Sequence, residues 1–183
     1  MAQRLLHGWI LTTALVVALV VPRPACGQQG DGGATAAIDT SDDGWSLLGR
    51  PPKEPLAVGS MLYAVHPFID TSKYKLISDN MDGAYVRSGQ LFLAGFRNSY
   101  NDQSWVVAVE RHWGTTSLWL LDFGVGYRAG IVTGYDERLV WLAGYTPILP
   151  LWGVVGWVHA GPVGGTAFWA YRAISLEATL RCC

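Results

Sequence analysis

Two side chains of this chain, His66 and Ser99, have the types and the placement to carry out nucleophilic chemistry. His66 ends an apolar stretch that begins at Leu56, and Ser99 directly follows a second stretch, Gln90–Asn98. An imidazole beside a serine hydroxyl can act as a general base when a carboxylate or an amide orients its ring. A polar surface pair with no reactive role is the alternative interpretation of the same two residues.

The kind of element that must position them is clearest in Trp119–Val132. Its odd positions hold large apolar side chains and its even positions are mostly small or charged. Since successive strand residues point to opposite faces, we predict a strand with one bulky and one small or charged face. Seven bulky positions match the apolar height of an outer membrane, and Trp119 and Tyr127 are typical of its interfacial aromatic rows. The alternative is a soluble lipocalin-like barrel, in which the bulky face would point inward.

Turn signals divide the rest of Pro55–Arg181 in the same way, with one turn expected at Gly114–Thr116. The strand-length segments are Leu56–His66, Asp82–Ser88, Gln90–Asn98, Ser104–Trp113, Trp119–Val132, Leu139–Val158, Val163–Tyr171 and Ile174–Arg181. We therefore predict an all-β fold, an eight-stranded antiparallel transmembrane β-barrel. In hydrocarbon every backbone amide needs a partner, so the last segment must pair with the first. Strands one and three then end at the same rim, which places His66 near Ser99.

The residues before the barrel indicate export. Arg4 precedes the apolar run Trp9–Val21, and Ala25-Cys26-Gly27 resembles a small-residue cleavage site. We expect a signal peptide over residues 1–27, a disordered leader and short pre-barrel segment over 28–54, and the outer-membrane barrel over 55–183. Lipidation of Cys26 is an alternative interpretation. The expected location is the cell outer membrane.

The predicted barrel interior combines two kinds of lining. Small or apolar side chains, which suit an acyl chain, are expected inward at Ala108, Leu118, Leu120, Gly124, Gly126 and Gly130. Charged side chains are expected inward at Glu110, Asp122, Arg128, Glu177 and Arg181, and an ion-pair network that fills the barrel is the alternative to a ligand site. Pro147 and Pro150 cannot donate to a strand ladder, so we predict that they leave an opening between strands for a lipid tail.

Other function classes find little support in the composition. The net charge of -1 gives no footprint for nucleic acid, and the three cysteines show no metal-ligand spacing. We expect no metal, no cofactor and a monomer.

Across Leu56–Arg181 the chain resembles the lipid A palmitoyltransferase (PagP) family of outer-membrane enzymes. The residues that carry the resemblance are His66, Phe96–Tyr100 (similar to the family's Phe-Lys-Asp-Ser-Trp), Gly124–Val132, Pro147–Leu151 and Gly161–Val163. The resemblance implies an eight-stranded barrel that holds one acyl chain. It also implies transfer of palmitoyl from membrane phospholipid to lipid A, by His, Ser and Asp side chains at the outer rim.

Carried over position by position, His66 matches the family's histidine, Ser99 its serine, and Asn98 stands where the family has aspartate. An asparagine can orient a ring but cannot stabilise an imidazolium. Glu110 falls near the pocket floor, so a chain shorter than palmitoyl is expected. The expected substrate-binding residues are Ala108, Glu110, Gly124, Gly126, Pro147 and Pro150. The expected activity is acyl transfer, and the alternatives are a non-catalytic lipid-binding or structural barrel and a soluble carrier.

Overall fold

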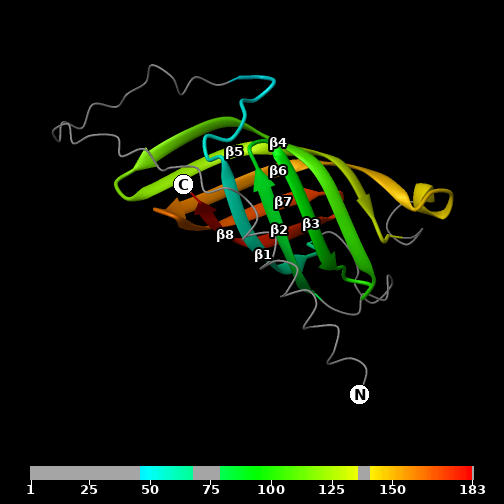
Figure 1. Ribbon diagram of the computed structural model, residues 1–183. Helices are drawn as coiled ribbons and strands as arrows, with labels where there is room; N and C mark the ends of the chain where they lie inside the picture. The colour runs from blue at the N-terminus through cyan, green and yellow to red at the C-terminus, as the bar shows by residue number, and fades with distance from the viewer. Residues whose placement is uncertain (1–45, 68–78, 136–140, 183) are drawn as a thin grey trace. The chain divides into compact units, whose positions relative to one another are not determined.

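The computed structural model describes residues 46–67, 79–135 and 141–182, and these form a closed antiparallel barrel (Figure 1). Its elements are β1 (Leu56–Val65), β2 (Asn80–Ser88), β3 (Leu91–Arg97), β4 (Gln103–Leu118), β5 (Leu121–Thr133), the short 3-10 helix η1 (Trp141–Gly144), β6 (Ile148–Ala160), β7 (Val163–Ala170) and β8 (Ala173–Cys182). The eight-stranded antiparallel barrel predicted from the sequence is thus confirmed. The predicted signal peptide, the leader up to residue 45 and Cys183 lie outside the described residues.

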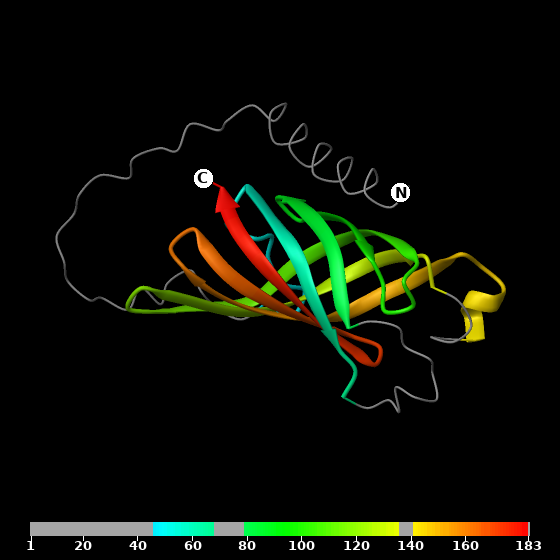
Figure 2. The same ribbon diagram turned by 90° about the horizontal axis from the view of Figure 1, so that it is seen from below.

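The first and last strands close the barrel as the sequence requires. β1 pairs with β8 from Leu56–Cys182 to Val65–Ile174, and Figure 2 shows β8 beside β1. With the ladder closed, the backbone amides of β1 and β8 have partners across the seam.

Two of the tight turns place a non-glycine residue in the left-handed region of backbone conformation, at Trp119 (φ 58) and Tyr171 (φ 53).

The hairpin between β4 and β5 differs from the prediction. Gly114–Thr116, predicted as a turn, lies inside β4, and the chain reverses only after Leu118. A bulge between His112 and Gly114 inserts an extra residue and switches which face each later residue occupies. Leu118, predicted inward, is therefore exposed on the outer face, and Leu120, also predicted inward, is exposed because it lies with Trp119 in the turn between the two strands.

The two faces of the strands otherwise follow the predicted sidedness. Large apolar side chains point outward and are exposed at Trp105, Val107, Ile131, Trp152, Trp169, Leu176 and Leu180. Charged side chains point inward and are buried at Glu110, Arg128 and Glu177. In the described part of the chain, no helix is both long and apolar enough to cross a membrane.

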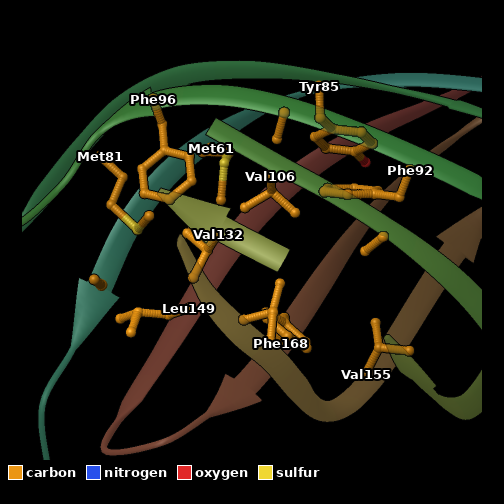
Figure 3. Packing of buried hydrophobic residues seen from close by; sticks show 14 residues of the cluster. Met61, Met81, Tyr85, Phe92, Phe96, Val106, Val132, Leu149, Val155 and Phe168 are labelled. Carbon is orange, nitrogen blue, oxygen red and sulfur yellow. The ribbon is translucent and has the colours of Figure 1, made fainter. Parts of the chain in front are cut away.

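The interior also contains large apolar side chains that the long strand alone did not predict. The labelled members of this cluster converge inside the barrel in Figure 3, and Tyr85 stacks on Phe92 with ring centroids 5.0 Å apart. The buried core includes Met61, Met81, Phe92, Phe96, Val106, Val132, Leu149, Val155 and Phe168. Glycine and charge therefore share the interior with an apolar core.

The segment before the barrel covers a free edge of β4. β3 pairs with β4 only as far as Val109, which leaves the following residues of β4 without a strand on that side. Arg50 fills part of this edge by exchanging two 2.8 Å backbone hydrogen bonds with His112. The short pre-barrel segment therefore acts as an extra piece of the sheet.

Candidate functional site

His66 and Ser99 meet at one rim of the barrel. His66 follows the last residue of β1, Ser99 lies two residues after the end of β3, and the His66 Nε2 atom is 3.4 Å from the Ser99 Oγ atom. Both side chains are largely buried. Antiparallel strand order alone predicted that they would share a rim, and the structure confirms this proximity.

A third group, Asp79, lies on the other side of the imidazole. Its Oδ1 atom is 3.6 Å from His66 Nδ1, and that nitrogen has no closer hydrogen-bond partner among the described residues. Burial lowers the pKa of His66, and the negative charge of Asp79 partly opposes this shift. The ring is consequently neutral near pH 7 and able to accept a proton. Asp79 was not among the site residues predicted from the sequence, although its place just before β2 puts it at the rim where β1 ends.

Asn98 makes its side-chain hydrogen bonds away from His66, which corrects the ring-orienting role predicted for it from the sequence. Its side chain is buried and stabilises the turn after β3. The Asn98 Nδ2 atom donates to Ser104 Oγ and to the backbone oxygen of Gly134, while Oδ1 accepts from the backbone amides of Tyr100 and Asp102. With all of these bonds made, Asn98 positions the backbone around Ser99.

The His66–Ser99 pair lies at the mouth of an apolar cavity inside the barrel. The cavity has a volume of about 80 Å³. Besides His66 and Ser99, its lining includes Met61, Met81, Phe92, Phe96, Tyr100, Val106, Val132, Leu151, Phe168 and Tyr171. Arg128 forms part of its inner end, with the guanidinium carbon 3.5 Å from the Phe92 ring centroid and 4.7 Å from that of Phe168. A polar mouth over an apolar chamber suits a ligand with a reactive head and a hydrocarbon tail.

Beyond Arg128 the interior contains an ion-pair network. Arg128 donates to both carboxylate oxygens of Glu177, at 2.8 and 3.2 Å, and twice to Glu110 Oε2, at 2.8 and 3.1 Å. Glu110 also lies 3.3 Å from Arg87 and from His112. Glu110 therefore pairs with Arg128, and the ion-pair network considered from the sequence is present in the barrel interior.

The predicted small lining residues have other roles. A Cβ atom on Gly124 would lie 2.0 Å from the Trp157 ring, and one on Gly126 would lie 2.1 Å from the backbone oxygen of Arg111. These glycines allow close packing and do not line the apolar cavity. Ala108 is buried in the core, and Glu110 lines a second, smaller polar cavity on the far side of Arg128.

The prolines interrupt only one side of the sheet. Pro147 precedes β6, and Pro150 lies within it, paired with Ile131 in an unbroken β5–β6 register, which corrects the expectation of a broken ladder there. On the other side, pairing with β7 starts only at Gly153–Ala170. Within the described strands, Ile148–Trp152 therefore has no β7 partner, and the Tyr171 hydroxyl donates to the Pro150 carbonyl across this gap.

Comparisons with known proteins provide no assignment: no protein-family model and no curated protein matches the chain. Within residues 46–67, 79–135 and 141–182, no three histidine, cysteine or acidic side chains gather as a metal site.

Proposed function

We propose that this chain is an outer-membrane acyltransferase that moves an acyl chain from a phospholipid to lipid A or a related lipid. The observation that carries the proposal is the His66–Ser99 contact at the mouth of an apolar cavity enclosed by the barrel. A reactive pair placed there would meet an ester group whose hydrocarbon tail lies in the cavity. On this proposal the export signal is cleaved and the barrel works as a monomer.

The first half of the reaction would acylate Ser99. As the Ser99 oxygen attacks the ester carbonyl, its proton passes to His66 Nε2, and the bond between the carbonyl carbon and the glycerol oxygen breaks. His66 then gives the proton to the departing alkoxide. In the second half, an acceptor hydroxyl loses its proton to His66 and attacks the acyl-serine, which releases the new ester and restores the Ser99 hydroxyl.

The outward face of the barrel supports its placement in a membrane. Large apolar side chains such as Trp105, Trp152 and Trp169 are exposed around a closed barrel, where a second layer of protein would be needed to cover them in water. On this proposal a lipid tail would reach the cavity past the side of Ile148–Trp152 that does not pair with β7, where the Tyr171 hydroxyl bonds to the Pro150 carbonyl.

The depth of the cavity supports a tail shorter than palmitoyl. From Ser104 near the rim to Glu110, β4 advances roughly 20 Å at about 3.4 Å per residue. Strand tilt reduces this to roughly 15 Å along the barrel axis, which is less than an extended palmitoyl chain. The buried Arg128 network closes the space beyond.

The test is mass spectrometry of lipid A and phospholipids from cells that express the wild type, Ser99→Ala or His66→Ala. We expect an added acyl mass in the wild type and its loss in both variants. Ser117→Ala on the far hairpin serves as the matched control and keeps the product, because Ser117 lies at the opposite end of the barrel. A product that persists in Ser99→Ala would contradict the proposed chemistry.

The same apolar cavity favours one alternative, a barrel that holds a lipid without transferring its chain. In that case the wild type adds no acyl mass, yet lipid co-purifies with the folded protein. Recovery of the protein in the soluble fraction would instead favour the soluble carrier.

A further inference from the structure

The carboxylate expected from the family is absent at Asn98, but another carboxylate faces the same histidine. We propose that Asp79 is the positioning residue for His66, supplying from the start of β2 the negative charge that Asn98 cannot supply at the end of β3. This inference rests on the proposed function. With this role for Asp79, the residues Asp79, His66 and Ser99 form one triad whose members come from three separate segments of the chain.

Asp79 is itself held in place from two directions. The Tyr63 hydroxyl donates to Asp79 Oδ2 at 3.1 Å, and the Ala64 amide donates to the Asp79 backbone oxygen at 2.7 Å. With Oδ2 engaged by Tyr63, the other oxygen, Oδ1, is the one that lies toward His66 Nδ1. The carboxylate is therefore oriented before any substrate arrives.

A β-bulge in the β1–β2 ladder creates this arrangement. The register shifts between Met61 and Tyr63 with the extra residue in β2, so that Tyr63 lies opposite Asn80, the residue after Asp79; against β8 the shift at the same place has the extra residue in β1. Bulges re-aim side chains next to functional sites. Here the bulge brings the Tyr63 ring and the Asp79 carboxylate to the same rim as the imidazole.

The chemical consequence concerns the tautomer and charge of the ring. A carboxylate at Nδ1 keeps the proton on that nitrogen, which leaves the Nε2 lone pair for the Ser99 hydroxyl. When His66 takes the serine proton, the same carboxylate stabilises the imidazolium. The 3.6 Å separation is longer than a normal hydrogen bond, and such contacts in free enzymes commonly shorten when substrate binds.

Other charged groups do not compete for this role. Among the described residues, Asp79 is the charged side chain that acts on His66, and Ser99 is its hydrogen-bond partner on the opposite nitrogen. Asp82 lies in the neighbouring strand β2, is exposed, and serves as a matched control.

The first experiment needs no enzymatic activity. NMR of the His66 ring in detergent micelles would compare the wild type with Asp79→Asn, Asp79→Glu and Asp82→Asn. Loss of the nearby negative charge destabilises the imidazolium, so Asp79→Asn lowers the pKa of His66 and increases the tautomer protonated at Nε2. Asp79→Glu restores the wild-type pKa in part, and Asp82→Asn leaves it unchanged. An unchanged pKa and tautomer in Asp79→Asn would overturn the inference.

The second experiment uses the acyl-transfer assay. We expect Asp79→Asn to lower kcat about 100-fold or more with little change in KM, because the acyl chain still binds in the cavity. Tyr63→Phe, which keeps the carboxylate but removes one of its anchors, is expected to lower kcat only about threefold to tenfold. If Ser99→Ala abolishes transfer while Asp79→Asn keeps the wild-type kcat, the proposed function stands and the role of Asp79 is refuted. If the wild type transfers nothing, the proposed function fails and the NMR result alone decides whether Asp79 positions His66.

Discussion

The two halves of the barrel interior satisfy their buried polar groups in opposite ways. At the rim with His66, one histidine nitrogen lies 3.4 Å from a hydroxyl and the other 3.6 Å from a carboxylate, over an open apolar cavity. In the far half, Arg128 makes four hydrogen bonds of 3.2 Å or less to two buried glutamates. The rim half keeps loosely held polar groups over the larger apolar cavity. In the far half the buried carboxylates are paired around a smaller polar cavity, where the two ring nitrogens of His159 have no hydrogen-bond partner among the described residues.

This difference separates stability from reactivity within one barrel. Buried charges are tolerated only when they are paired and hydrogen-bonded, so the far half has little freedom to change. An unfilled apolar cavity forgoes dispersion contacts that a ligand can restore, so the rim half is the part suited to binding. Arg128 and the rings of Phe92 and Phe168 form the boundary between the halves.

The largest expected effect comes from breaking the far half. Arg128→Met leaves Glu110 and Glu177 without their main partner, and we expect unfolding free energy to fall by about 3–5 kcal/mol. The measurement is equilibrium unfolding in detergent micelles. Arg97→Met, which removes a surface hydrogen bond to Asn101, is the control and is expected to cost under about 1 kcal/mol. Equal losses in the two variants would remove the distinction between the halves.

The second effect tests the turn that positions Ser99. The family resemblance suggests that an aspartate at position 98 would raise activity, but the structure leads to the opposite expectation. An aspartate cannot donate to Ser104 and Gly134, and it would bury a charge in a site that is 1% exposed. We expect Asn98→Asp to cost about 1–3 kcal/mol in unfolding free energy and to lower transfer. Higher activity in this variant would show that the residue faces the histidine in the working enzyme.

The third effect is the pH dependence of the rim half. A general base works when neutral, and burial places the pKa of His66 below its ordinary value of 6.5. The rate should therefore be level between about pH 7 and 8 and fall about tenfold per pH unit at pH values well below the His66 pKa. Initial rates across this range measure it, with Ser99→Ala as the background. A rate that continues to rise above pH 7 would point to a different base.

The smallest effect concerns chain length. Val106 lines the rim cavity, and Val106→Phe would place a ring in space that is now empty. An overpacked core typically loses about 1–3 kcal/mol of unfolding free energy, and we expect Val106→Phe to lose less than this because the ring has room. The longest transferred acyl chains are expected to be lost from the product. Mass spectrometry of the product lipid gives the chain-length distribution. An unchanged distribution would place the tail outside this cavity.

Much of the architecture was predictable because period-two patterning is local. The parity of Trp119–Val132 and Ile174–Arg181 reports sidedness directly, and antiparallel order then brings His66 and Ser99 to one rim. The bulges could not be foreseen, since a single inserted residue leaves no compositional mark, and this is why Leu118 was placed on the wrong face. Asp79 was missed for a related reason, because the irregular stretch before β2 hid its register with β1.

The measurement that most directly tests the division of the interior uses a phospholipid with a photoreactive diazirine near the end of its acyl chain. After irradiation, mass spectrometry locates the crosslinked residues in the folded barrel. We expect crosslinks to cavity residues on the rim side of Arg128, such as Phe92, Val106 and Val132. Crosslinks confined to the outer face at Trp105 and Trp152, or found beyond Arg128 at Trp157, would contradict it.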